Sequence, residues 1–153
     1  MNRELRQLFI NLFKTAWING HGYSFNKNKN SDMYVISHKN SGAYVLLNHR
    51  NPKKISLVLG ETPNAHRGKG IAMKLRALAT IFAAMSRTPI THQGVWRVAK
   101  RANNKNNRPP TTRIVRNKLG WNAVGNSKNT SIYKPKNRNN NSLRRAKQIL
   151  EGN

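Results

Sequence analysis

The sequence predicts a single mixed α/β domain in which helices flank a central mixed sheet. Apolar residues recur at helical spacing over residues 3–18 and 72–85, and short apolar runs bounded by turn residues lie between and after these segments. A glycine-containing run at residues 67–72 joins an apolar strand-like segment to the second helix, which is the order of a strand-loop-helix unit.

Helical periodicity predicts the first element, an amphipathic helix over residues 3–18. Its apolar face consists of Leu5, Leu8, Phe9, Leu12, Phe13 and Trp17. Asn19-Gly20 ends this helix, and the polar stretch up to Ser31 predicts a loop. Turn-rich spacers then separate three apolar runs, and these predict strands at residues 33–37, 43–48 and 55–59. The third run is apolar enough to be a central strand.

The second half begins with a helix over residues 72–85, followed by a strand within residues 89–96. After a basic, asparagine-rich loop, Thr111 or Thr112 is expected to cap a short helix over residues 113–119, which Gly120 ends. A final strand pair is predicted at 121–124 and 131–134. The globular domain therefore covers residues 1–134, and residues 135–153 are a basic tail whose short helix, at 142–150, is expected to become ordered on a partner.

The charge balance is strongly one-sided. The chain has 29 Lys and Arg residues against four acids, Glu4, Asp32, Glu61 and Glu151, and its formal net charge is +25. A field of this size favours a polyanionic partner, and nucleic acid bound by counterion release is the leading prediction. An anionic membrane surface is the weaker alternative, because no segment is a clear basic amphipathic membrane helix.

Composition also excludes several classes of protein and site. The chain has no cysteine, which rules out disulfides, thiolate nucleophiles and cysteine-ligated metals. The few carboxylates and the spacing of His21, His38 and His49 predict no metal site. No apolar run is as long as a membrane span, and the first residues lack the apolar region of a signal peptide. We therefore expect a cytoplasmic protein associated with nucleic acid.

The run Arg67-Gly68-Lys69-Gly70-Ile71-Ala72 is the most informative motif. Two glycines allow the backbone to approach a ligand closely, and the helix start behind them presents N–H groups without intrahelical partners. This combination favours phosphate or pyrophosphate. The run is neither a Walker A motif nor a dinucleotide-binding glycine motif.

In this context the run resembles motif A of the GNAT family of acyl-CoA N-acyltransferases, Gln/Arg-x-x-Gly-x-Gly/Ala. Arg67, Gly70 and Ala72 occupy its fixed positions. Residues 113–121 are similar to the late helix of that family, which commonly ends in Tyr-Glu-Lys-Leu-Gly-Phe. The resemblance covers about residues 33–134 and implies a GNAT-like fold, in which two strands of the central mixed sheet splay apart.

The resemblance implies that acetyl-CoA or another acyl-CoA is bound. Backbone N–H groups of the glycine run would hold the pyrophosphate, and the edge of the preceding strand would pair with the pantetheine arm. The implied binding residues are Leu59, Glu61, Arg67, Gly68, Lys69, Gly70, Ile71 and Ala72.

The catalytic residues are less well defined. Arg116 occupies the position of the tyrosine that protonates the leaving thiolate in many family members, so Tyr133 or Tyr23 would have to replace it. Glu61 and His92 are the candidate bases. The alternatives are that Glu61 is a turn residue paired with nearby cations and that His92 is a hydrogen-bonded strand histidine.

Aromatic and basic residues together predict where nucleic acid would bind. Trp96 is followed by three cations, a mixture suited to base stacking beside phosphate contacts, although core packing is the commoner role of such a tryptophan. The predicted nucleic-acid residues are Trp96, Arg97, Lys100, Arg101, Lys136, Arg138, Arg144, Arg145 and Lys147.

The function predicted from the sequence is an acyl-CoA-dependent N-acyltransferase acting on nucleic acid or a nucleic-acid-associated substrate. That substrate could be tRNA, a DNA base, as in phage modification systems, or a bound protein. The alternative is a non-catalytic GNAT-like protein that binds nucleic acid in a nucleoid, ribosome or virion.

Overall fold

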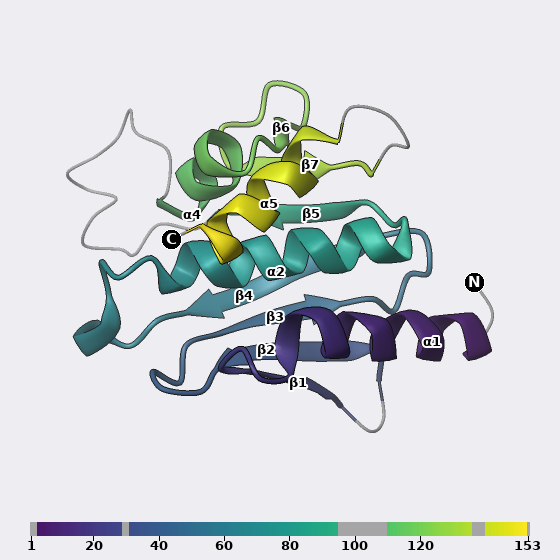
Figure 1. The fold of residues 1–153 in the computed structure, drawn as a ribbon. Coiled ribbons are helices and arrows are strands. Elements are labelled where there is room, and N and C mark those ends of the chain that lie inside the picture. The colour runs from purple at the N-terminus through teal and green to yellow at the C-terminus, as the bar shows by residue number, and fades with distance from the viewer. Residues whose placement is uncertain (1–2, 29–30, 95–109, 136–139, 153) are drawn as a thin grey trace.

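The computed structural model describes residues 3–28, 31–94, 110–135 and 140–152 (Figure 1). Its strands are β1 (Tyr23–Lys27), β2 (Met33–His38), β3 (Tyr44–Asn48), β4 (Ile55–Glu61), β5 (Ile90–Gln93), β6 (Asn122–Ala123) and β7 (Thr130–Tyr133). They form one sheet in the order β1-β2-β3-β4-β5-β7-β6. Neighbouring strands are antiparallel except for β4 and β5, which are parallel. The sheet is therefore mixed, as the sequence predicts.

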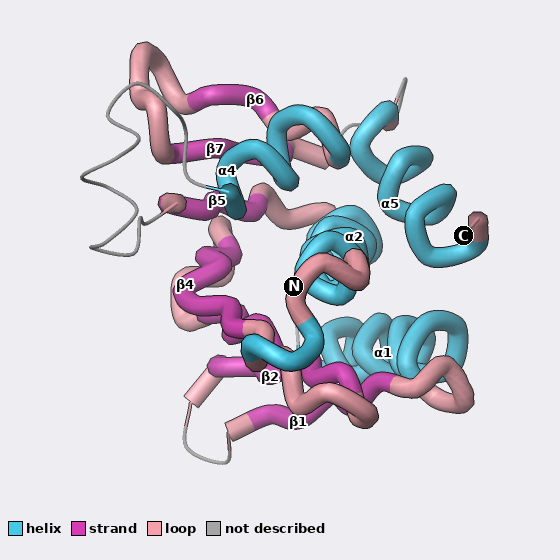
Figure 2. The backbone as a smooth tube through the Cα atoms, turned by 90° about the vertical axis from the view of Figure 1, so that its left-hand side faces the viewer, coloured by secondary structure: helices cyan, strands magenta, loops and turns pink. Residues whose placement is uncertain are grey.

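The helical segments are α1 (Arg3–Phe13), η1 (Lys14–Ile18), η2 (Asn64–His66), α2 (Ile71–Ser86), α4 (Pro110–Arg113), η3 (Ile114–Lys118) and α5 (Asn141–Glu151). Helices α1, α2 and α5 lie on the same face of the sheet (Figure 2). Helix α2 contacts β2, β3 and β4 directly, and α1 and α5 pack beside it. The prediction of a large mixed sheet flanked by helices is confirmed.

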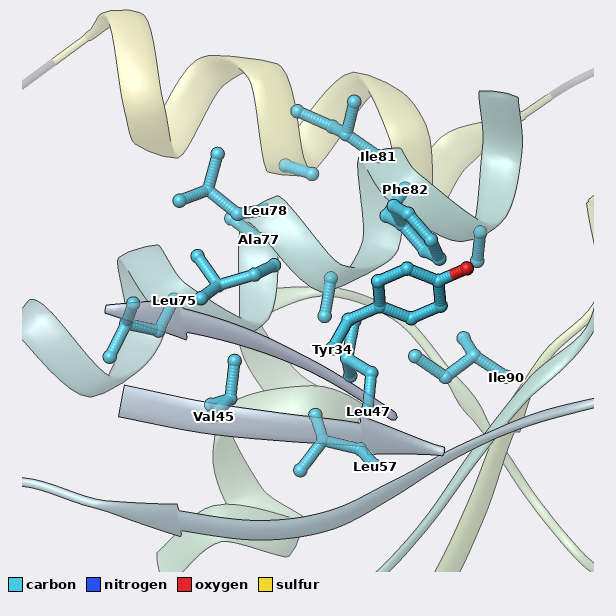
Figure 3. Close-up of a cluster of buried hydrophobic side chains, with 14 of the residues drawn as sticks. Tyr34, Val45, Leu47, Leu57, Leu75, Ala77, Leu78, Ile81, Phe82 and Ile90 are labelled. Carbon is cyan, nitrogen blue, oxygen red and sulfur yellow. The ribbon is translucent and has the colours of Figure 1, made fainter. Parts of the chain in front are cut away.

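Aromatic packing holds α1 and α2 onto the sheet. The ring of Phe82, on α2, lies 5.1–5.6 Å from the rings of Phe9, Phe13, Phe25 and Tyr34. Tyr34 and Phe82 face each other among the aliphatic side chains of β3, β4 and β5 (Figure 3). Aromatic pairs at these distances add to the hydrophobic stabilisation of burial, so this cluster fixes α2 over the strands that position the site.

The predicted loop before Ser31 is wrong, because this segment contains strand β1. Tyr23 and Phe25 are buried, whereas the side chain of Asn26 is exposed. Pairing with β2 joins this short alternating segment to the sheet. Apolar and polar residues alternate in this segment, as in a strand. The alternation covers too few residues to predict a strand within a segment that is otherwise polar.

The apolar face predicted for α1 is divided in the structure. Phe9 and Phe13 are buried, but Leu5, Leu8 and Leu12 are each more than half exposed. The helix packs against the rest of the protein through Phe9, Ile10 and Phe13, and the outer residues of its apolar stripe remain in solvent because the stripe is wider than the contact surface.

Two predictions about the C-terminal third need revision. The short helix begins at Pro110, so neither Thr111 nor Thr112 caps it, and a proline suits a first helical position. The predicted helix of the tail corresponds to α5. This helix packs against α2 within the same chain, with Ala146 buried at the contact.

Candidate functional site

The site begins where β4 separates from β5. These strands pair only through Ile55–Ile90, Ser56–Thr91 and Leu57–His92, and β4 then continues to Glu61. Within the described residues, the remainder of β4 has no partner on its β5 side.

An irregularity on the opposite edge of β4 coincides with this separation. Leu47 of β3 lies opposite Leu57, whereas Leu46 lies opposite Leu59, so Val58 is an additional residue in β4. Such a bulge bends the strand and increases its twist, and it lies at the residue after the last β4–β5 pair.

The glycine run follows the end of β4 and opens α2. Gly68 and Gly70 have positive φ angles of 80° and 77°. Gly70 is the N-cap of α2, and no side chain caps this end of the helix. A β-carbon at either position would meet nothing closer than 4.0 Å, so backbone conformation, not lack of space, requires glycine. The first N–H groups of α2 therefore have no side-chain cap, and such groups at a helix start attract anions.

Positive charge surrounds this helix start. The Nε atom of Arg67 donates a hydrogen bond to the Thr62 carbonyl at 3.0 Å, and Lys69 is exposed. Burial lowers the pKa of His38, and the charges of Lys74 and His66 lower it further. Lys69, before α2, and Lys74, near its start, therefore supply positive charge that attracts an anion.

Arg76 lies one turn further into α2 and is only 2% exposed. Its Nη1 atom donates to the Ala72 carbonyl at 3.0 Å, whereas its buried Nε has no partner. Nη2 lies 2.6 Å from the position that a β-carbon of Gly60 would occupy. Burial lowers the pKa of Arg76 to about 10, so the guanidinium remains charged at neutral pH. Glycine at position 60 thus makes room for a buried cation.

His92, on β5, is a second buried polar side chain at this place. Its Nδ1 atom lies 3.4 Å from the Leu57 carbonyl oxygen, and its buried Nε2 has no partner. Burial, followed by the charge of Arg76, lowers the pKa of His92 to about 4. The ring is therefore neutral at pH 7. When Nδ1 carries the proton and donates to Leu57, Nε2 presents an unshared lone pair.

We expect His92 to make the fold less stable as the pH falls from about 6.5 to about 4. In this interval the unfolded histidine, with its ordinary pKa of 6.5, binds a proton that the folded histidine does not bind. Denaturant unfolding of the wild type and of His92→Gln between pH 4 and 7 measures this contribution. His21→Gln, at an exposed position, is the matched control. An identical pH dependence in the wild type and in His92→Gln would contradict the prediction.

The other predicted catalytic residues, Glu61 and Tyr133, lie far from each other. Glu61 is exposed at the end of β4. Tyr133 is buried, pairs with Ile90 at the start of β5, and donates its hydroxyl hydrogen to Asn140 Oδ1 at 2.5 Å. Through Ile90, Tyr133 lies level with Ile55 at the start of β4, whereas Glu61 lies at the end of that strand. At about 3.3 Å per strand residue, these two levels of the sheet are about 20 Å apart. The structure therefore does not bring Tyr133 and Glu61 together.

Arg116, at the position where the resemblance expects a tyrosine acid, has a structural role. Its Nε donates to Ser131 Oγ at 2.8 Å, and its Nη2 donates to the carbonyls of Thr130 and Ser127 at 2.7 and 2.9 Å. These bonds fasten η3 to the β6–β7 hairpin.

The predicted nucleic-acid residues divide into two groups. Arg144 and Lys147 are exposed on α5, and Arg145 is half-buried beside them, where its Nη1 donates to the Asn117 carbonyl at 3.3 Å. The others, Trp96, Arg97, Lys100, Arg101, Lys136 and Arg138, lie outside the described residues.

Sequence reasoning missed Arg76, although the sequence contains a pattern that points to it. Arg76 follows Ala72 and precedes Thr80 at intervals of four residues, so it interrupts a face of α2 made of small and apolar residues. A cation at such a position must either be buried or distort the packing of the helix.

Comparisons with protein families, curated proteins and solved structures find no match to this chain. Within the described ranges, no group of three or more histidine and acidic side chains is placed to hold a metal ion. No described helix combines the length and apolar character needed to cross a membrane.

Proposed function

We propose that this protein is an N-acyltransferase of the GNAT type that uses acyl-CoA and acts on nucleic acid or on a substrate bound to it. One observation carries the proposal. The glycine-opened start of α2 follows the end of β4, the strand that separates from its parallel neighbour β5. One continuous strand-loop-helix segment thereby contains helix N–H groups without a side-chain cap and strand amides that have no partner on the β5 side among the described residues.

The residues present are compatible with acyl-CoA. The N–H groups of residues 67–72 would bind the diphosphate, where the helix dipole and Lys69 favour negative charge. The strand amides of residues 58–60 would bind the pantetheine arm and polarise the reacting carbonyl. A bound acyl-CoA supplies an activated thioester.

His92 is the candidate base beside the part of β4 that does not pair with β5, and its pKa of about 4 makes it a weak acceptor for the proton of the attacking amine. Its Nε2 lone pair is unused in the described chain and lies at the last paired row of β4 and β5. In the transfer an N–C bond forms and the C–S bond breaks. The amine loses a proton to His92 Nε2 or to water, and solvent protonates the departing thiolate, since Arg116 cannot act as the acid.

The charge of the protein indicates the acceptor class. A net charge of +25 with only four acids is much more than an acyl-CoA site requires. The exposed cations of α5 extend the positive surface beyond the glycine run. A nucleic acid, or a protein bound to it, is the acceptor class that matches this charge.

A second candidate is a non-catalytic nucleic-acid-binding protein with the same scaffold. It is favoured by Arg116, whose guanidinium serves the β6–β7 hairpin at the place where the resemblance expects a proton donor.

Calorimetry with acetyl-CoA, on protein stripped of nucleic acid, distinguishes the two candidates. The acyltransferase is expected to bind with micromolar affinity and to transfer labelled acetyl groups to an acceptor in a screen of tRNA, DNA and associated proteins. A folded protein that binds no acyl-CoA would overturn the enzyme proposal and leave the binding protein.

A further inference from the structure

Arg76 is a buried cation that has no counter-ion in the part of the chain that the structure describes. Asp32 forms the ion pairs seen among the described residues, at 3.3 Å with Arg6 and 3.6 Å with Lys27. The remaining acids, Glu4, Glu61 and Glu151, have exposed side chains. Burying a charge without a partner is costly, so the position of Arg76 indicates that an anion from outside the chain completes the site.

The free edge of the guanidinium defines the shape of that anion. Nη1 donates a hydrogen bond to the Ala72 carbonyl, whereas Nε and Nη2 donate no hydrogen bond within the described chain. These two atoms carry the parallel N–H bonds with which arginine binds both oxygens of a carboxylate. The free edge therefore matches a carboxylate in its planar, two-oxygen geometry.

The surroundings of this edge place the carboxylate near the reacting group. Nη2 lies over Gly60, in the part of β4 that has separated from β5. The charge of Arg76 lowers the pKa of His92, which is buried at the last paired row of β4 and β5. When neutral His92 donates from Nδ1 to the Leu57 carbonyl, its Nε2 carries no hydrogen to donate to the anion. Of these two side chains, only Arg76 would then bind the anion.

We propose that Arg76 binds a carboxylate at the far end of the transferred acyl group, so that the natural donor is the CoA thioester of a short dicarboxylic acid. This inference rests on the proposed acyltransferase function and names its donor class. An acyl group bound through the amides of residues 58–60 would have its far end near the free edge of Arg76.

The test compares succinyl-CoA with butyryl-CoA, which have the same number of acyl carbons and differ in the terminal carboxylate. By calorimetry, the wild type is expected to bind succinyl-CoA at least about tenfold more tightly. Arg76→Met should remove this preference. Arg50→Met changes the net charge equally at an exposed position beyond the opposite end of β4, and it should keep the preference.

Stability provides a second readout. Arg76→Met removes a buried charge without a partner, so we expect this variant to melt at a higher temperature than the wild type. If Arg76→Met fails to fold, Arg76→Lys replaces it in the binding test. Lysine keeps the charge but lacks the two parallel N–H donors of arginine, so Arg76→Lys should prefer succinyl-CoA less strongly than the wild type does. Equal affinity of the wild type for both thioesters, or an unchanged preference in a folded Arg76 variant, would refute the proposal.

Free succinate tests the carboxylate site at Arg76 independently of the proposed acyl transfer. If neither thioester binds, the acyltransferase proposal fails, and thermal melts in succinate then decide the carboxylate site. A rise in the melting temperature of the wild type, but not of Arg76→Met, would support a carboxylate site without acyl transfer. The absence of this difference would overturn both proposals.

Discussion

Gly70→Glu is expected to abolish acyl-CoA binding, with a loss of affinity of about a hundredfold or more. The substitution places a carboxylate at the N-cap of α2, where the proposed site binds a diphosphate, so like charges would meet at the free N–H groups of the helix. Calorimetry with acetyl-CoA measures this loss. Unchanged affinity would remove the glycine run from the proposed binding site.

The structure offers a control for backbone strain at position 70. Gly42, in the turn between β2 and β3, has a φ angle of 75° and no atom within 4 Å of an added β-carbon. Gly42→Glu therefore imposes the same left-handed conformation and the same charge change, at a cost of about 1–2 kcal/mol in each protein. We expect equal destabilisation of the two variants and normal acyl-CoA binding by Gly42→Glu.

Nucleic-acid binding is expected to weaken steeply with salt. If the cations of α5 contact phosphates, the double substitution Arg144→Gln with Lys147→Gln should reduce the slope of log affinity against log salt by about 1.8 on duplex DNA, since each contact contributes about 0.9. Fluorescence anisotropy between 50 and 300 mM salt provides the measurement. A flat salt response of the wild type would contradict polyanion binding altogether.

The matched control for this pair is Lys53→Gln with Lys54→Gln, two exposed cations before β4. It removes the same charge from a different surface, so a slope reduced equally in both proteins would indicate general electrostatics without a specific role for α5. Substitution is preferable to deletion of residues 135–153, because deletion would also expose the α2 surface that α5 covers.

Much of the secondary structure could be predicted because it depends on local pattern. The spacing of apolar residues, every second residue in strands and about every 3.6 residues in helices, predicted the ends of β2, β3, β4 and α2 to within about two residues. The glycines before α2 indicated a loop that opens a helix, and the positive φ angles of Gly68 and Gly70 confirm it. Strand β1 was missed because five residues contain little periodicity, and only its pairing with β2 stabilises it as a strand.

The candidate site was predicted in part, because only some of its residues belong to a local motif. Residues 67–72 carry their pattern in a single run. Arg76 and His92 became neighbours only when α2 packed over the sheet, in which β5 pairs with β4. Their pKa values are lowered chiefly by burial, which depends on the surrounding chain and not on neighbours in sequence.

The sequence by itself determined the α/β class, the excess of positive charge and the glycine run that opens a helix. Each of these depends on composition or on residues within a few positions of one another. The tertiary structure decided that the described pairing of β4 with β5 ends at Leu57. It also decided that Arg76 is buried without a counter-ion among the described residues, and that α5 belongs to the helical layer. These features depend on which surfaces meet after the chain folds, because burial and strand register arise from contacts between residues distant in sequence.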